Sequence, residues 1–325
     1  MSPCARLTRT STTRSLRTRS PTSCSRTSPR TEMPFISYDD CLVRLRAQVA
    51  MKSPIIGAGA GTGISAKFAE RGGVDLIIIY NSGRYRMAGR GSAAGMLSYG
   101  DANAIVVDMA REVLPIVKNT PVLAGVCGTD PFRMMRVFLP ELKAMGFDGV
   151  QNFPTVGLID GQFRQILEET GMSIQLEVDM IAKAHELKML TCPYVFDKYT
   201  AMEFAKAGAD VVVAHVNTTV AGSIGVKKAA MSKDEAVERV QEMHDAAKKV
   251  NKNVIVLCHG GPIATPADAQ YVLSRTKGVA GFFGASSIER LATEPAIENM
   301  TKQFKRIKLG KNGDRVRSTG KRRKS

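Results

Sequence analysis

The stretch Val211-Val-Val-Ala-His215 is a continuous apolar run that ends in a polar residue, and a helical stretch follows it at 233–250. Continuous apolar runs are typical of strands that are buried on both faces of a parallel sheet. The same order, an apolar run that ends in a small or polar residue and then a helical stretch, recurs along the chain. Eight such runs occur, at 54–59, 76–80, 122–126, 149–153, 190–194, 211–215, 254–258 and 281–284.

Eight β–α units over roughly 250 residues match a closed (β/α)8 TIM barrel. We therefore predict that fold for 33–308, with a helix at 38–50 that could cover the bottom of the barrel. Asp130-Pro131 and Thr265-Pro266 predict helix starts, because each offers a capping side chain followed by proline. The helices expected between and after the strands lie at 62–72, 102–118, 131–145, 175–187, 198–207, 233–250, 266–276 and 286–307.

The net charge of +16 is concentrated at the two ends of the chain. Residues 1–32 carry seven Arg and one acid, and residues 302–325 carry eleven Lys and Arg and one acid. The intervening 33–301 contains 28 basic and 28 acidic residues. A nucleic-acid groove needs cations that cluster on the folded domain, so we expect no nucleic-acid binding by the barrel. Association with nucleic acid through the tails alone stays a separate hypothesis.

The ends of the chain are predicted to be disordered, 1–32 as an Arg-, Ser- and Thr-rich extension and 309–325 as a basic tail. The composition of 1–32 also resembles a mitochondrial transit peptide, although its prolines interrupt any amphipathic helix. No apolar stretch approaches the ~20 residues of a transmembrane helix, so we expect no membrane partner. Six Cys without a CxxC spacing or a secretory signal indicate a reducing compartment. We predict a cytoplasmic protein, with a mitochondrial location as the alternative.

Two predicted connections are long, at 81–101 and 154–174, and long loops in a barrel are often binding loops. The first contains Arg84, Arg86 and Arg90, whose guanidinium groups could close over an acidic substrate. A solvated loop is the alternative for any single one of them.

Glycine-rich segments at the ends of strands could approach a ligand closely. Gly57-Ala-Gly59-Ala-Gly61-Thr-Gly63 lacks the spacing of a dinucleotide fingerprint, so we interpret Gly59 as part of a substrate site or as a packing residue. After the last two strands, backbone amides and hydroxyls could hold a phosphate or similar anion. This second group consists of Gly260, Gly261, Ser286 and Ser287.

Polar side chains at the predicted strand ends are the remaining candidates. His215 and His259 end adjacent strands and could transfer protons at one reacting centre, because imidazole titrates near neutral pH. Cys127 is expected to be a small core side chain rather than a nucleophile. The other strand-end candidates are Asn81, Thr129, Asp130, Gln151, Asn152, Thr155, Tyr194 and Asn217.

Long motifs carry a resemblance to a known family. They are GAGAGTGISA at 57–66, YNSGRYRMAGRGS at 80–92, GVCGTDPF at 125–132, QNFPTVGLIDG at 151–161 and GFFGASSIER at 281–290. Together, over about 35–308, they resemble the phosphoenolpyruvate hydrolase-like, or indole-glycerol-phosphate-synthase-like, TIM-barrel family. The resemblance implies the barrel fold and suggests a homodimer. Related barrels hold Mg2+ on acidic strand-end motifs. This chain has no such motif at the corresponding strands, so the cofactor stays open.

We therefore predict an enzyme that binds a small phosphorylated or carboxylated, pyruvate-like substrate and acts by hydrolysis or by C–C or C–P cleavage. The predicted catalytic residues are His215, His259 and Asn152. The alternative is a non-catalytic barrel that binds a metabolite. The predicted substrate-binding residues are Gly59, Asn81, Arg84, Arg86, Arg90, Thr129, Gln151, Gly260, Gly261, Ser286 and Ser287.

Overall fold

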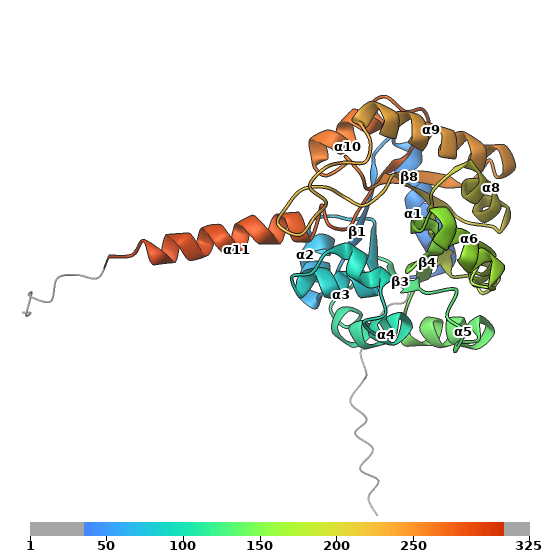
Figure 1. The fold of residues 1–325 in the computed structure, drawn as a ribbon, viewed down its shortest axis with the longest axis horizontal. Coiled ribbons are helices and arrows are strands. Elements are labelled where there is room, and N and C mark those ends of the chain that lie inside the picture. The colour runs from blue at the N-terminus through green and yellow to red at the C-terminus, as the bar shows by residue number, and fades with distance from the viewer. Residues whose placement is uncertain (1–35, 309–325) are drawn as a thin grey trace, which may run out of the picture. The chain divides into compact units, whose positions relative to one another are not determined.

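Each of the eight apolar runs contributes to one parallel sheet, and the run at 190–194 is divided between two short strands. The computed structural model describes residues 36–308, so the predicted disordered segments at 1–32 and 309–325 lie outside the described residues. Helices surround the curled sheet (Figure 1). The strands are β1 (Ile55–Gly59), β2 (Leu76–Ile79), β3 (Val122–Val126), β4 (Gly149–Asn152), β5 (Leu190–Thr191), β6 (Tyr194–Val195), β7 (Val211–His215), β8 (Ile255–His259) and β9 (Gly281–Gly284).

The strand order is β5-β4-β3-β2-β1-β9-β8-β7-β6, with every pair parallel. The two edge strands of this order, β5 and β6, are consecutive in the chain and are separated only by Cys192 and Pro193. This arrangement is an α/β fold with a curled parallel sheet, consistent with a TIM-like barrel. Because the strands are parallel, all their C-terminal ends lie at one end of the sheet.

A glycine allows β1 and β9 to pair closely. A Cβ atom at Gly281 would lie 1.9 Å from the carbonyl oxygen of Ile55, which is the register partner of Gly281. That oxygen belongs to the backbone and cannot move without disturbing the strand pairing.

We expect Gly281→Ala to lower the free energy of unfolding by about 3 kcal/mol or more, because overpacking against backbone cannot relax through a side-chain rotation. Gly100→Ala is the matched control, since its Cβ would meet the end of the flexible Ile105 side chain at 3.2 Å. Urea unfolding of both variants checks the expectation, which is wrong if the two lose equal stability.

Three aspartates tie the N-terminal ends of neighbouring strands together. Asp75, Asp148 and Asp210 stand directly before β2, β4 and β7. Each carboxylate accepts a hydrogen bond from an amide in β1, β3 or β5, at 2.8–3.0 Å. Burial raises the pKa of Asp148 to about 6.

The helix α1 (Tyr38–Ala50) covers this N-terminal end of the sheet, as the sequence predicts. Its Tyr38 hydroxyl donates to Asp210 at 2.6 Å, and its Arg44 donates to the carbonyl of Asn119 at 2.7 Å. Asp210 precedes β7 and Asn119 precedes β3, so α1 reaches strands that are far apart in the sheet order. The opposite, C-terminal end is left for a functional site.

The structure corrects two predicted helix starts. Asp130 accepts hydrogen bonds from Phe132 N and Asn103 Nδ2 in a turn, and the helix begins only at Met135. Ser286 caps no helix, because the last helix begins at Arg290. Thr265-Pro266 does form the predicted start, with a capping box. Every strand except β5, which leads directly into β6, is followed by one or more helices. The principal ones are, in chain order, α2 (Gly63–Arg71), α4 (Ala102–Val113), α5 (Met135–Met145), α7 (Ile174–Glu186), α8 (Lys198–Lys206), α9 (Lys233–Val250), α10 (Pro266–Leu273) and α11 (Arg290–Lys305).

The two connections that were predicted as loops are partly helical. The segment 81–101 contains α3 (Asn81–Met87) and the 3-10 helix η1 (Ser92–Met96). Glycine favours this packing: a Cβ at Gly83 of α3 would lie 2.9 Å from the carbonyl oxygen of Ala60, so α3 rests against the end of β1. The segment 154–174 contains η2 (Val156–Leu158) and α6 (Gly161–Glu169). None of the helices in 36–308 has the length and hydropathy needed to cross a membrane.

Candidate functional site

A cavity of about 330 Å³ lies at the C-terminal end of the sheet. Its walls come from the ends of strands and from the segments α3, η1 and η2, which are distant in the sequence. Most of the exposed surface of the cavity is apolar, although more than half of the lining residues carry a polar or charged side-chain group. The lining residues are Tyr80, Ser82, Arg86, Ser92, Ala93, Met96, Leu97, Phe153, Leu158, Ile159, Tyr194, His215, Asn217, Thr218, Thr219, His259, Ala285 and Ser286.

The two predicted histidines meet in this cavity. His215 and His259 are the last residues of β7 and β8 and are register partners. Their ring centroids are 4.6 Å apart, and both side chains are buried. Burial lowers the pKa of His259 to about 4. Burial, together with the neighbouring His259, lowers the pKa of His215 well below its usual value. Both imidazoles are therefore neutral at neutral pH.

The hydrogen bonds of the two rings require opposite tautomers. Nδ1 of His215 accepts from the amide of Asn217 at 3.2 Å, so a neutral His215 carries its proton on Nε2. Nδ1 of His259 lies against the carbonyl oxygen of Phe283, so it carries the proton and leaves Nε2 as an acceptor. No side chain in 36–308 bonds to either Nε2. The cavity thus has one imidazole donor beside one imidazole acceptor.

Tyr194 packs beneath the histidines at the start of β6. Its ring centroid lies 4.9 Å from that of His215 and 5.0 Å from that of His259. Its hydroxyl is buried and forms no hydrogen bond of normal geometry within 36–308, although Tyr80 lies near it, and burial raises its pKa well above the usual value. A buried hydroxyl without a partner is costly, so Tyr194 provides a polar group that a ligand in this cavity could satisfy.

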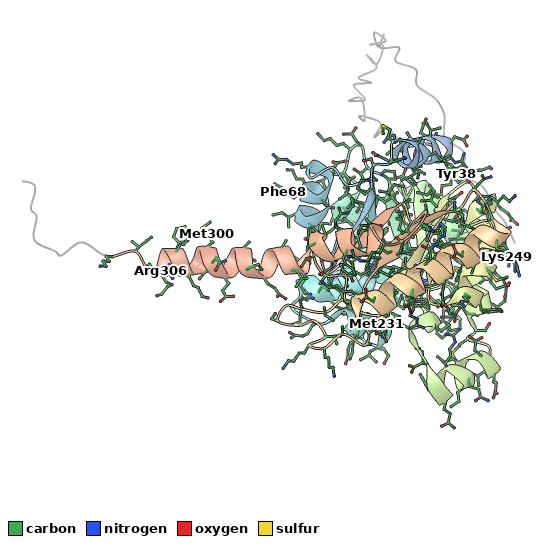
Figure 2. All side chains as sticks on the ribbon, turned by 90° about the horizontal axis from the view of Figure 1, so that it is seen from above. Tyr38, Phe68, Met231, Lys249, Met300 and Arg306 are labelled. Atoms are coloured by element: carbon green, nitrogen blue, oxygen red, sulfur yellow. The ribbon has the colours of Figure 1, made fainter. Side chains whose placement is uncertain are left out.

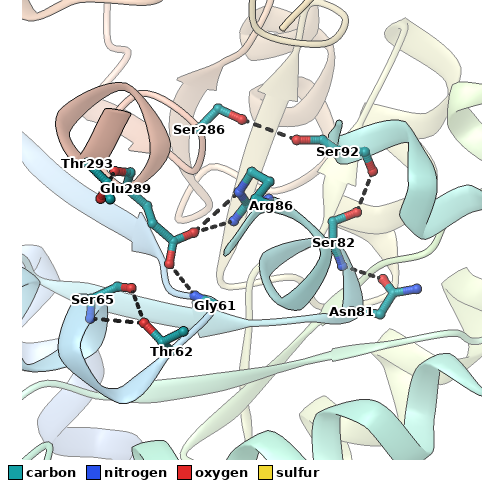
Figure 3. Close-up of polar contacts among 10 residues, drawn as sticks. All are labelled: Gly61, Thr62, Ser65, Asn81, Ser82, Arg86, Ser92, Ser286, Glu289 and Thr293. Atoms are coloured by element: carbon teal, nitrogen blue, oxygen red, sulfur yellow. Dashed lines mark hydrogen bonds and ion pairs between the residues drawn. The ribbon is translucent and has the colours of Figure 1, made fainter. Parts of the chain in front are cut away.

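Arg86 is held by a buried carboxylate, as Figure 3 shows. Nε and Nη2 of Arg86 both donate to Oε2 of Glu289, at 3.3 and 3.2 Å. The other carboxylate oxygen of Glu289 accepts from the amide of Gly61 at 2.5 Å. Gly59 leaves room for this arrangement, since a Cβ there would lie 3.2 Å from Nη2 of Arg86. The ion pair fixes the guanidinium at the cavity wall beside Tyr80, whose ring centroid lies 5.3 Å from Cζ of Arg86.

Hydroxyl groups join η1 to the end of β9 beside Arg86 (Figure 3). The hydroxyls of Ser92 and Ser286 are 3.2 Å apart, and Ser82 donates to the carbonyl of Ser92 at 2.7 Å. Asn81 supports this contact from behind by donating to the carbonyl of Gly95 at 2.9 Å. One of the two hydroxyls donates to the other, so the pair leaves one hydroxyl hydrogen that could point to a ligand beside Arg86.

Four residues that were predicted to be catalytic or substrate-binding line the cavity: Arg86, His215, His259 and Ser286. Two further strand-end candidates, Tyr194 and Asn217, line it as well. Three more lie directly behind it and hold its walls: Gly59, Asn81 and Asn152. Asn152 is fully buried, donates to Glu177 at 2.7 Å and accepts from the amide of Tyr194 at 2.7 Å, so it positions Tyr194 and has no free group for a substrate.

The other predicted site residues lie outside the cavity lining. Arg84 pairs with Asp108 at the surface, and Arg90 is exposed. Thr129 lines a separate cavity between α5 and α7. Gln151 donates to the carbonyl of Cys192, and the buried hydroxyl oxygen of the half-buried Ser287 has no partner among the described residues.

The glycines predicted to bind an anion pack two loops together. Gly260 and Gly261 have φ values of +81° and +55°, and a Cβ at either would lie 2.1–2.2 Å from a carbonyl of the loop after β7. The amide of Gly261 already donates to the carbonyl of Asn217.

Glu177 is a buried acid that the sequence patterns did not indicate. It lies in α7 and accepts from Asn152 Nδ2, Thr155 Oγ1 and Val156 N, at 2.7–2.8 Å. Burial raises its pKa to about 7 despite these bonds. Glu177 thereby connects α7 to the segment after β4 that forms one cavity wall. Glu289, the partner of Arg86, was also missed, although it lies inside the family motif at 281–290.

The raised pKa of Glu177 predicts a pH dependence of stability. Protonated Glu177 favours the folded state, so its contribution is complete below about pH 4.5 and is lost as the pH rises through about 7. We expect Glu177→Gln to reduce the decline in unfolding free energy between about pH 5 and about pH 8 by roughly 2 kcal/mol. Glu186→Gln, at an exposed position of α7, should leave the decline unchanged. Urea unfolding of both variants across this pH range measures the decline, and equal declines in the two variants would contradict the expectation.

The donor set around the cavity does not fit a divalent metal. Mg2+ prefers carboxylate oxygens, and no Asp or Glu is among the lining residues. Both oxygens of Glu289, the carboxylate behind Arg86, are used by protein donors. Within 36–308 no three His, Cys, Asp or Glu side chains form a cluster that could hold a metal ion.

Comparison with known proteins assigns the chain to a family. The model of the phosphoenolpyruvate hydrolase-like family matches residues 40–307, and the chain belongs to that family. It is 60% identical over 268 residues to the tomato (Solanum lycopersicum) ToMV susceptible protein tm-1(GCR26), and equally to the tomato ToMV resistance protein Tm-1(GCR237). These matches cover 82% of this chain and 35% of each relative, so the chain spans about a third of the length of these tomato relatives.

Solved structures share the fold at low identity. A phosphonopyruvate hydrolase in complex with oxalate and Mg++ superposes with a TM-score of 0.51 at 17% identity, over 82% of this chain and 87% of the other. A phosphoenolpyruvate phosphomutase from Streptomyces platensis subsp. rosaceus gives a TM-score of 0.52, also at 17% identity, over 81% and 87%. At this identity the likeness shows the fold alone.

Proposed function

We propose that the chain forms an eight-unit barrel, with β5 and β6 as one interrupted strand, and that it is an enzyme acting on a small pyruvate-like acid in the cavity. The observation that carries the proposal is the pair of neutral histidines in opposite tautomers beside Arg86. A donor and an acceptor within one wall can move a proton to and from the same substrate. Family membership and the shared fold with enzymes of phosphonopyruvate and phosphoenolpyruvate support this substrate class.

The acid group of the substrate would bind at Arg86. Arg86 and one hydroxyl of the bonded Ser92–Ser286 pair would offer donors on one side of the cavity, as a carboxylate or phosphate requires. A carboxylate fits better than a phosphate dianion, because Arg86 is the one charged residue of the described lining and Glu289 offsets its charge. The apolar residues of η1 and η2 would then exclude water from the bound acid.

The histidines would act on the other end of the substrate. Nε2 of His215 can donate to an oxygen that becomes negative during the reaction, and Nε2 of His259 can accept a proton. A bound anion raises the pKa of a nearby imidazole, which would bring the low pKa of His259 closer to neutrality and make the ring a better base. The reaction class is hydrolysis or cleavage of a C–C or C–P bond next to the acid.

A second candidate function is binding without turnover. The largely apolar surface of the cavity and the absence of carboxylates from its described lining favour it over metal-assisted chemistry. In this reading the same residues would recognise a metabolite, and the neutral histidines would serve only as a hydrogen-bond donor and acceptor.

Melting temperatures and turnover, measured together, distinguish the two. Phosphoenolpyruvate, phosphonopyruvate, pyruvate and longer 2-oxo acids are added to the full chain, with inorganic phosphate as a reference. A ligand that binds the folded state raises the melting temperature. Stabilisation with product formation supports the enzyme, and stabilisation without product supports the binding protein. If no acid in the panel stabilises the chain, neither proposal survives.

A further inference from the structure

The cavity at the C-terminal end of the sheet is larger than a pyruvate-like acid requires. If each non-hydrogen atom takes about the 30 Å³ that a water molecule occupies in the liquid, the three carbons and three oxygens of pyruvate fill roughly 180 Å³. The cavity has a volume of about 330 Å³. Roughly 150 Å³ is then left, which is room for about five further carbon atoms. Pyruvate alone would leave almost half of the cavity to water.

The polar groups that could bind the acid lie on one side of the cavity. Arg86 comes from α3, and the hydroxyl of Ser286, just after β9, lies 3.2 Å from that of Ser92. Phe153 follows β4 directly, and four steps in the sheet order separate β4 from β9. Tyr80 stands between the two sides, because its ring centroid lies 5.3 Å from Cζ of Arg86 and 4.6 Å from the ring centroid of Phe153. An acid held at Arg86 therefore leaves the Phe153 side for another part of the ligand.

Large apolar side chains line the cavity away from Arg86. They are Met96 and Leu97 at the end of η1, and Phe153, Leu158 and Ile159 after β4. η1 is a 3-10 helix that begins at Ser92, so at about 2 Å per residue Leu97 lies roughly 10 Å further along it. Leu97 is 56% exposed although it lines the cavity. An apolar part of a ligand would remove this surface from water, which is favourable.

The connection after β4 has already used polar groups of its backbone within the protein. The amide of Val156 donates to Glu177 at 2.8 Å, and its carbonyl accepts from Arg164 at 2.7 Å. The amide of Ile159 donates to the same carbonyl at 3.0 Å. A charged part of the ligand would find little compensation on this side, whereas burial of an apolar part costs no hydrogen bond.

We infer that the substrate is a pyruvate-like acid whose head group carries an apolar chain of about five carbons. The inference rests on the proposed function, because it places the carboxylate at Arg86 and the reacting carbons beside His215 and His259. The chain would extend from the head group toward Leu97 and Ile159 and fill the volume that pyruvate leaves open. It would thereby distinguish this substrate from pyruvate and phosphoenolpyruvate, which lack such a chain.

Binding of a homologous series of 2-oxo acids to the full chain tests the inference. Calorimetry measures the dissociation constants of pyruvate, 2-oxobutyrate, 2-oxohexanoate and 2-oxooctanoate. A fully buried methylene strengthens binding about fourfold. We therefore expect 2-oxooctanoate, which has five more methylenes than pyruvate, to bind at least about 100-fold more tightly. 2-Oxodecanoate should bind little more tightly than 2-oxooctanoate, because the cavity is then full.

Two substitutions in the apolar lining locate the chain. Leu97→Asn and Ile159→Asn replace an apolar side chain by a neutral amide of similar size. We expect each to lower the ratio of the affinities for 2-oxooctanoate and pyruvate by about tenfold, since the chain loses an apolar contact. Val43→Asn is the matched control and should leave the ratio unchanged. Val43 is 65% exposed on α1, the helix that also carries Tyr38 (Figure 2), at the opposite end of the sheet. Circular dichroism verifies that all three variants fold.

A series in which pyruvate binds but affinity does not rise with chain length overturns the inference and leaves the proposed function in place. 1-Heptanol carries an apolar chain without the acid. If it binds as tightly as 2-oxooctanoate, the acid is not recognised, and the proposed function fails together with the inference. No binding of any acid has the same consequence. A rise with chain length that neither Leu97→Asn nor Ile159→Asn reduces places the chain elsewhere and also overturns the inference.

Discussion

Arg86→Met is expected to destabilise the folded chain by about 3–5 kcal/mol, because it leaves the carboxylate of Glu289 buried without its cation. Both side chains of the pair are about 1% exposed, so water cannot replace the lost partner. Glu289→Leu should cost a similar amount, since it strands the Arg86 charge and removes the acceptor of the Gly61 amide. Equilibrium unfolding in urea gives both values.

The double variant Arg86→Met/Glu289→Leu tests whether the loss of stability in the single variants comes from the unpaired buried charge. Removing both charges leaves no unpaired ion, so we expect it to be more stable than either single variant. Additive losses in the double variant would show that the two residues act independently. Arg84→Met provides a matched control in the same helix, because its ion pair with Asp108 is exposed and should contribute less than about 1 kcal/mol.

The second large effect concerns turnover. If the enzyme proposal holds, His215→Ala/His259→Ala should lower kcat/KM by a factor of about 10²–10⁴, which is the usual contribution of a positioned acid and base. The stabilisation that a bound carboxylate gives should persist in large part, because Arg86, Ser92 and Ser286 remain. Full activity in the double variant would remove the histidines from the mechanism.

His185→Ala is the control for a general effect of losing an imidazole. His185 lies in α7 near Tyr38 and Asp210, at the N-terminal end of the sheet and away from the cavity. It should retain activity. Single variants add a further distinction: in the proposed roles His259→Gln loses the base, whereas His215→Gln keeps a side-chain donor and should retain more activity.

The strands were predictable from sequence because burial on both faces demands continuous apolar runs. Residues 76–79 and 211–214 are wholly inaccessible, and the predicted bounds agree with the structure to within one residue for most strands. The run at 190–194 was different. Apolar pattern alone could not show that Pro193, which has no amide hydrogen, falls where the chain changes from pairing with β4 to pairing with β7.

The candidate site was predictable in part for a similar reason. Parallel strands place His215 and His259 together, and the pattern of apolar runs is sufficient to predict this. The role of Arg86 among three loop arginines was not predictable, because it depends on Glu289, which is 203 residues away and reaches it only through the fold. Helices α3 and α6 were missed because glycine and polar residues favour loops locally, whereas contacts such as Gly83 against Ala60 decide the outcome.

The interruption between β5 and β6 has a consequence for motion in the chain. β5 pairs with β4, and β6 pairs with β7, through only two residues in register. Among the described strand pairs, only β8 and β9 share so short a register. We therefore expect amide hydrogens of β5 and β6 to exchange with solvent faster than those of the longer-paired strands, because few backbone hydrogen bonds hold these two strands. Tyr194 is the first residue of β6 and also lines the cavity. A ligand that fills the cavity should therefore slow amide hydrogen exchange in β5 and β6.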